Sequence, residues 1–396
     1  MRVLATSLLS ICTLLTACAV APPPALLPAE IFIDANFGPP TEIIDTREVF
    51  TASAAMKRFL AEDIAYQLRQ RGAQAGLVEA LYRRTQLRLE YDGGRTRNAA
   101  EAFAARSGNC LSLVIMTAAF AKELNVPVTF QSAYLEETWS RSGSLLFASG
   151  HVNVTLGRRI VDARTSRDLN PLTIDFLPPE DIRGLRVRDI DESTVVAMYA
   201  NNRAAEALAE GRVDDAYAWS RESLRRDPGF LGAYNTLGVV YMRHGDLGRA
   251  GQVFELVLGR DERNTRALSN MAEVFVRQGQ GEQAAALRQR LAAIESEAPF
   301  HYFNLGLAAM QQQDWRTARD YFAREVKRAD YYHEFHFWLG LADWQLGDVV
   351  EANKHLALAM ENSVTRAQHD LYAAKLEWLK SRRGRGSEAE PARSGG

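Results

Sequence analysis

A period of 34 residues runs through the C-terminal half of the chain and limits what that half can fold into. Small residues recur at one position of the period, alanines recur at a second, and glycines mark a third, where Gln313 replaces glycine once. This pattern is typical of stacked helical hairpins, because small side chains let paired helices cross closely. The three series are Ala204, Gly238, Ala272, Gly306 and Gly340; Ala216, Ala250, Ala284, Ala318 and Ala352; and Gly211, Gly245, Gly279 and Gly347.

The three series resemble the tetratricopeptide repeat, a helix–turn–helix unit of the same length. The resemblance covers residues 197–366 as five units and implies an all-α solenoid. Residues 367–381 carry apolar side chains at helical spacing and are predicted to form a capping helix. Residues 382–396, rich in Arg, Gly and Ser, are predicted to be a disordered tail.

The resemblance also implies that the concave face of the solenoid binds a protein or peptide partner. The implied groove positions are polar at the N-terminal end and aromatic or aliphatic at the other end, which indicates an apolar anchor pocket there. The alternative is that several of these aromatic side chains pack inside the superhelix. The implied groove residues are Asn201, Asn235, Phe303, Leu307, Phe337, Leu341 and Trp344.

In the N-terminal half, the stretch Ser107-Gly108-Asn109-Cys110 precedes an apolar run that repeats with helical period as far as Leu124. Asn109 is a good N-cap, so the sequence predicts a helix that begins at or just after Cys110. A thiol in the first turn of a helix is favoured as the thiolate by the unpaired N–H groups and the helix dipole. We therefore interpret Cys110 as a candidate nucleophile.

The segments around Cys110 predict an α+β domain over residues 31–185. Helices are expected over 52–70, 75–89 and 98–105, before the helix that begins at Cys110. Alternating patterns then predict strands over 126–139, 151–156 and 159–163, with a polar loop at 140–144. The second strand carries His151 and the third carries Asp162.

This order resembles the transglutaminase-like, papain-related cysteine hydrolases. The resemblance covers about residues 95–165 and implies that Cys110 is the nucleophile, His151 its base and Asp162 the acid that orients the base. Chemistry supports the set, because a hydrolytic thiol needs a base and the base needs a carboxylate to fix its tautomer. Each residue taken alone has a simpler interpretation, namely a buried structural thiol, a loop histidine and a residue that ends a strand.

The N-terminus predicts export and a lipid anchor. Residues 1–18 have one Arg, an apolar stretch and small residues before Cys18, which is the form of a signal peptide. Leu15-Thr16-Ala17-Cys18 resembles the lipobox of bacterial lipoproteins, which implies lipidation of Cys18, and Ala19 favours the outer membrane over the inner membrane. Residues 19–30, with three consecutive prolines, are predicted to be an extended tether.

Signal processing would leave Cys110 as the one thiol of the mature chain, since Cys12 leaves with the signal and Cys18 carries lipid. His151 is the first of seven histidines, and the others lie from residue 244 onward. A solitary thiol in an oxidising compartment is either deeply buried or kept for chemistry.

The charge pattern narrows the partner class. The net charge of −2 gives no basic surplus for nucleic acid.

His333-Glu334-Phe335-His336 resembles a zinc-protease motif but lacks one spacer residue, so we expect no metal site and no cofactor.

The sequence as a whole predicts a periplasmic, lipid-anchored cysteine hydrolase, either a protease or amidase or an acyl transferase, whose repeats recruit a protein substrate or partner. The alternative is a catalytically inactive lipoprotein of the same architecture that acts as a scaffold or assembly factor at the outer membrane.

Overall fold

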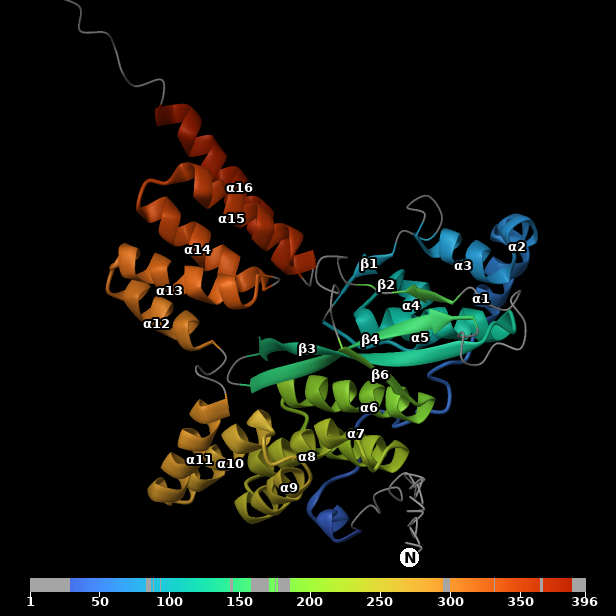
Figure 1. Ribbon diagram of the computed structural model, residues 1–396, viewed down its shortest axis with the longest axis horizontal. Helices are drawn as coiled ribbons and strands as arrows, with labels where there is room; N and C mark the ends of the chain where they lie inside the picture. Colours follow the sequence, from blue (N-terminus) through green and yellow to red (C-terminus); the bar gives the residue numbers. More distant parts are fainter. Residues whose placement is uncertain are drawn as a thin grey trace, which may run out of the picture.

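The computed structural model places a mixed α/β region before a long array of helices (Figure 1). The predicted order of an α+β region followed by helical repeats is confirmed. The structure describes residues 29–82, 87, 89–92, 94–142, 145–157, 171–174, 176, 186–294, 300–330, 332–363 and 366–386. Residues 1–28, which include Cys18 and most of the predicted tether, lie outside the described residues.

The single helix predicted over residues 52–70 is instead divided into three segments. A π-helical turn interrupts it and closes with a hydrogen bond from the Ile64 N–H to the Phe59 carbonyl. Both side chains are buried in the same core, so the wider turn keeps them on the same side of the helix. The helices are η1 (Ala29–Ile31), η2 (Asp34–Asn36), α1 (Ala54–Arg58), η3 (Phe59–Asp63), α2 (Ala65–Arg71), α3 (Ala73–Tyr82), α4 (Ala99–Ala105) and α5 (Cys110–Glu123).

Two sheets accompany these helices. Strands β1 (Glu90–Tyr91) and β2 (Ser107–Gly108) form a short parallel pair. The larger sheet is antiparallel with strand order β5-β4-β3-β6. Its strands are β3 (Val128–Ser142), β4 (Leu145–Leu156), β5 (Leu172–Ile174) and β6 (Arg186–Ile190).

The first two predicted strands are present as β3 and β4, and both are longer than expected. The residues assigned to a polar loop at 140–144 belong partly to β3, which continues to Ser142, and β4 already begins at Leu145. The third predicted strand, over 159–163, lies outside the described residues, and β5 is the described strand that pairs with the far edge of β4.

Helix α5 is the centre of the first core. It packs against β4, and its residues from Leu111 to Ala121 are all buried. Val152, Val154 and Leu156 alternate along β4 and are buried in the same core. A helix that is apolar on every face belongs in the interior of a domain, which explains why this one is surrounded.

The second half is a helical array with the predicted 34-residue spacing. The small residues of the two series lie on paired helices and are buried. A Cβ atom on Gly238 would lie 2.4 Å from the ring of Phe254, so the close helix crossing requires glycine. The helices are α6 (Glu192–Ala209), α7 (Val213–Arg226), α8 (Leu231–His244), α9 (Leu247–Arg260), α10 (Thr265–Arg277), α11 (Gly281–Ile294), α12 (His301–Gln311), α13 (Trp315–Arg328), α14 (His333–Gln345), α15 (Val349–Glu361) and α16 (Arg366–Gly386).

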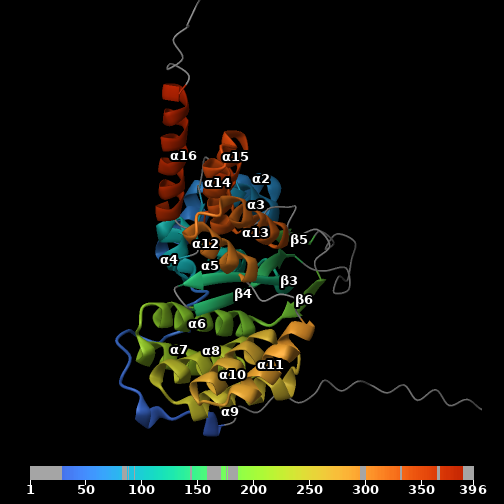
Figure 2. The same cartoon turned by 90° about the vertical axis from the view of Figure 1, so that its left-hand side faces the viewer.

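The array differs from the predicted uninterrupted solenoid between α11 and α12. Figures 1 and 2 both draw α12–α16 apart from α6–α11, and among the residues that the structure describes the buried core of α6–α11 shares none with that of α12–α14. Leu305 of α12 is 37% exposed, whereas its counterparts Leu237 and Leu339 are buried. The predicted capping helix is present as α16, which continues to Gly386, past the predicted boundary at residue 381.

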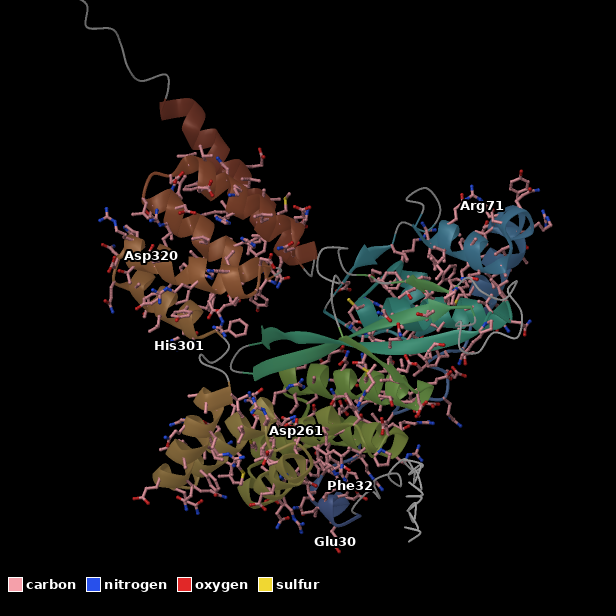
Figure 3. The ribbon with its side chains drawn as sticks, in the orientation of Figure 1. Glu30, Phe32, Arg71, Asp261, His301 and Asp320 are labelled. Carbon is pink, nitrogen blue, oxygen red and sulfur yellow. The ribbon has the colours of Figure 1, made fainter. Side chains whose placement is uncertain are left out.

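Helix α6 joins the two halves, because Val195 and Tyr199 on it belong to the core formed around α5. The N-terminal segment 29–46 adds a second connection by running along α7–α9 (Figures 1 and 3). Among the described residues, no helix combines the length and the apolar character that crossing a bilayer requires.

Candidate functional site

Cys110 is the first residue of α5, as the sequence predicts, and its side chain is half-buried. The cap is formed by Asn109, whose Oδ1 accepts a hydrogen bond of 2.9 Å from the Ser112 N–H. Gly108 is required before the cap, since a Cβ atom there would lie 2.6 Å from the Ser112 Cβ. The thiol therefore stands in the first turn of a buried helix.

A cluster of hydrogen bonds supports this cap. The Asn109 Nδ2 donates to the Thr96 hydroxyl at 2.8 Å, and the Ser112 hydroxyl donates to the Asn109 Oδ1 at 2.8 Å. The Ser112 hydroxyl also accepts from the Arg97 N–H at 2.8 Å. Thr96 and Ser112 are fully buried. The sequence does not mark these two residues, because a threonine in a loop and a serine in a helix carry no distinctive spacing.

Opposite charges lie beside the loop. Arg97 forms an ion pair of 2.8 Å with Asp92, and the Asp92 N–H donates to the Gly108 carbonyl at 3.0 Å. Arg106 ends α4 in the left-handed conformation with φ of 51° and is exposed. The ion pair and the hydrogen bond thus connect residues 92–97 with Gly108, two residues before Cys110.

The other two predicted catalytic residues are described only in part. His151 lies in β4 with its backbone opposite Ala133 of β3, and the pairing register shifts immediately after this pair. The position of the His151 side chain and the whole of Asp162 lie outside the described residues. The catalytic triad therefore stays a prediction.

Three of the predicted groove residues, on α6, α8 and α12, are buried or half-buried. Asn201 is half-buried. Asn235 is buried and its Nδ2 donates to the Asn264 Oδ1 at 3.3 Å. Phe303 is fully buried, with its ring 5.3 Å from that of Phe335, so its side chain belongs to the core of α12–α14.

The remaining groove residues lie at the C-terminal end. The Phe337 ring stacks on that of Tyr372 at 4.9 Å, and the Trp344 ring lies 6.1 Å from that of Trp378. Both partners belong to α16, so Phe337 and Trp344 contact aromatic side chains of that helix, and both are themselves half-buried. Leu307 and Leu341 are half-buried.

The histidines of α14 are engaged in internal contacts. His333 Nδ1 lies 2.7 Å from the Tyr372 hydroxyl. His336 Nε2 lies 2.7 Å from the Asp330 carbonyl, and its Nδ1 lies 3.0 Å from the Nδ1 of His355. No group of three or more metal-binding side chains occurs among the residues that the structure describes.

Solved structures of helical-repeat proteins match part of the chain. PilF of Pseudomonas aeruginosa is 20% identical with a TM-score of 0.30, and the match covers 48% of this chain and 87% of that protein. TTC0263, a thermophilic TPR protein in Thermus thermophilus, is 19% identical with a TM-score of 0.30, and the match covers 46% and 98%. YrrB, a TPR protein with an unusual peptide-binding site, is 20% identical with a TM-score of 0.24 over 45% and 92%.

No family model matches the sequence, and no curated protein matches it. Because each TM-score is below 0.5, the repeat fold is assigned from the spacing and packing of α6–α16 themselves. The class of protein is thus an α+β domain joined through α6 to a tetratricopeptide-like helical array.

Proposed function

We propose that the α+β domain performs acyl transfer through Cys110 and that the repeat array binds a protein or peptide partner. The observation that carries the proposal is the capped position of Cys110 at the start of a buried helix that packs against β4, the strand of His151. A helix N-terminus favours a thiolate, and a strand beside it supplies a fixed place for a base.

Chain geometry supports the pairing of Cys110 with His151. Helix α5 ends at Glu123, and β3 begins at Val128, which pairs with Leu156 at the end of β4. Measured back from Glu123, α5 reaches Cys110 after ~20 Å, at 1.5 Å per residue. Strand β4 reaches from Leu156 to His151 in ~17 Å at ~3.4 Å per residue. Because α5 packs against β4, two similar lengths measured back from neighbouring ends would bring Cys110 and the backbone of His151 to the same end of this helix–strand pair.

The proposed reaction has two steps. The Cys110 thiolate attacks an amide carbonyl, and the Cys110 N–H donates to the developing oxyanion. His151 gives a proton to the departing amine, which leaves a thioester on Cys110, while Asp162 orients the His151 ring. Attack by water on the thioester makes the protein a protease or amidase, and attack by an amine makes it a transferase.

The alternative function is a non-catalytic scaffold. One observation favours it, since Val195 and Tyr199 of the repeat array are buried in the same core as α5. A domain that shares its core with a helical array can act as a structural extension of that array, without chemistry of its own.

Alkylation of Cys110 by iodoacetamide at pH 6.5 separates the two functions. A thiolate maintained by a neighbouring histidine predicts rapid labelling in the wild type and slow labelling in His151→Ala. Equal slow labelling in both would support the scaffold. His244→Ala is the matched control, since His244 lies on α8 and packs against Phe37.

We further propose that the chain is lipidated at Cys18 and lies on the periplasmic face of a bacterial outer membrane. The sequence of residues 15–18 and the tether that follows support this anchor. Cys18→Ser is expected to release the protein from the membrane fraction into the soluble periplasmic fraction. Unchanged membrane association would contradict lipidation.

A further inference from the structure

A side chain of the repeat array reaches the segment that supports the cap of α5. Glu206 lies on α6, and its Oε1 accepts a hydrogen bond of 2.6 Å from the Thr96 N–H. Thr96 is fully buried in the segment that precedes α4. Residues 110 positions apart in the chain thus meet behind the candidate site.

Two further hydrogen bonds connect Thr96 to the start of α5. The Thr96 hydroxyl accepts from the Asn109 Nδ2 at 2.8 Å. The Asn109 Oδ1 in turn accepts from the Ser112 N–H and caps the helix. The position of the cap, and with it the direction in which Cys110 leaves the helix, therefore depends on where Thr96 is held.

Glu206 is itself fixed by a buried arginine. The Arg203 Nη1 donates to the Glu206 Oε2 at 3.1 Å, and its Nη2 donates to the Glu42 Oε2 at 2.6 Å. Arg203 is buried. Burial raises the pKa of Glu206, whereas the bonds from Thr96 and the charge of Arg203 oppose the rise. A carboxylate taken out of water in this way is destabilising unless its partners are all in place.

We propose that Glu206 is a positioning residue for Cys110, so that the first helix of the repeat array is a part of the candidate site. The inference rests on the proposed function, because it concerns the orientation of the proposed nucleophile. The carboxylate holds the Thr96 backbone, Thr96 holds Asn109, and Asn109 fixes the first turn of α5. A partner that displaces α6 would therefore change the reactivity of Cys110.

The test compares Glu206→Ala with Glu206→Gln in the full chain. Both remove the charge, but glutamine keeps an oxygen that accepts from the Thr96 N–H. The matched control is Glu210→Ala. It removes a largely exposed carboxylate that pairs with Arg212 and lies at the end of the same helix. The measurement is the rate of Cys110 alkylation by iodoacetamide between pH 6 and pH 9, beside a melting curve for each variant.

Glu206→Ala is expected to lower the rate at pH 6.5 on the order of tenfold and to move its pH profile to higher pH, because a displaced cap moves the thiol away from the N–H groups that favour the thiolate. Glu206→Gln is expected to recover most of the rate, and Glu210→Ala to leave the rate and the profile unchanged. A purely structural role for Glu206 would change the melting curve and leave the pH profile in place, which would overturn the proposal.

A second variant covers the case in which Glu206→Ala does not fold. Thr96→Val keeps the shape of the buried side chain but removes the acceptor for Asn109, and the same loss of rate is expected. If His151→Ala and the wild type react alike, the proposed function fails. If His151 matters and neither Glu206→Ala nor Thr96→Val changes the profile, the proposed function stands and the positioning role is wrong.

Discussion

At the scale of single residues, the inter-helix turns explain the one break in the glycine series. Gly211, Gly245, Gly279 and Gly347 all have φ between 76° and 98°, and Gln313 occupies the same turn with φ of 60°. A side chain in this left-handed conformation is strained, whereas glycine is not.

Gln313→Gly is therefore expected to stabilise the protein by roughly 0.5–1 kcal/mol, because glycine relieves the strain at the end of α12. Gln312→Gly is the matched control: its φ of −84° suits any residue, so the same change there should stabilise nothing. Melting temperatures of the two variants measure the difference, and an unchanged or lower value for Gln313→Gly would contradict the assignment of the turn.

The nucleophile loop supplies a second test at this scale. In Gly108→Ala the added methyl group would overlap the Ser112 Cβ, so the cap must shift, at a cost of about 1–3 kcal/mol in folding stability. Gly259→Ala, where nothing lies within 4 Å of the added atom, should be neutral or slightly stabilising. Chemical unfolding of both variants gives the comparison, and similar stabilities would mean that the loop is not tightly packed.

At the scale of elements, the N-terminal segment 29–46 behaves as a bound peptide on α7–α9. The Phe37 ring stacks on Tyr217 at 3.8 Å, and the Tyr217 hydroxyl donates to Asp34 at 2.7 Å. Two backbone groups of the segment are also bonded, since the N–H groups of Gly38 and Thr41 donate to Asp214 and Asp215.

Loss of the aromatic contact should release this segment. Phe37→Ala is expected to destabilise the docked segment by about 1–3 kcal/mol and to speed hydrogen exchange at the amides of Gly38 and Thr41. Ile43→Ala serves as the control, because the Ile43 side chain is 87% exposed and supports nothing. Exchange rates that do not change in Phe37→Ala would show that the ring is not what holds the segment.

Local signals predicted some elements well and others poorly. The start of α5 and the helical hairpins were predictable, because a cap residue and a fixed period act within a few residues. The π-helical turn at Phe59 was not predictable, because it depends on burial in a shared core. The docking of segment 29–46 was not predictable either, because it depends on contacts with residues more than 100 positions away. The hydrogen bond between Glu206 and Thr96 is a long-range contact of the same kind.

At the scale of the whole molecule, the repeat period and the packing disagree. The small-residue series continues in step from Ala272 to Gly306, yet Leu305 of α12 is 37% exposed, whereas its counterparts in α8 and α14 are buried. A period describes each hairpin and its spacing, but it does not ensure that every neighbouring pair stacks. Among the described residues, the buried core of α12–α14 and a smaller buried cluster of α15 and α16 are both separate from the core of α6–α11.

Helices α12–α16 should be sensitive to acid. Burial lowers the pKa of His333 to about 4 and is the main cause that lowers the pKa of His355 to about 4. Burial also lowers the pKa of His336. Between pH 6.5 and pH 4 the unfolded chain takes up protons that these folded histidines do not, so stability falls as the pH falls.

Asp343 acts in the opposite sense, since burial raises its pKa to about 6 and its folded form gains protons below that pH. Each of the two histidines with a pKa of about 4 contributes on the order of 2 kcal/mol of lost stability at pH 5, so the histidines outweigh the aspartate. His333→Gln should therefore lose less stability than the wild type between pH 7 and pH 5, measured by melting temperature. His369→Gln is the exposed control, and equal pH dependence in the wild type and His333→Gln would contradict the role of burial.

Acyl transfer requires that Cys110 form a thioester. The direct measurement is the mass of the intact protein and of its Cys110 peptide during reaction with p-nitrophenyl acetate at pH 7. We predict one acetyl group on Cys110 in the wild type, with release of p-nitrophenolate in a burst, a much slower reaction in His151→Ala, and no acetyl group at this position in Cys110→Ser. Acetylation of Cys110 at the same rate in the wild type and His151→Ala, or none at Cys110 in either, would contradict acyl transfer.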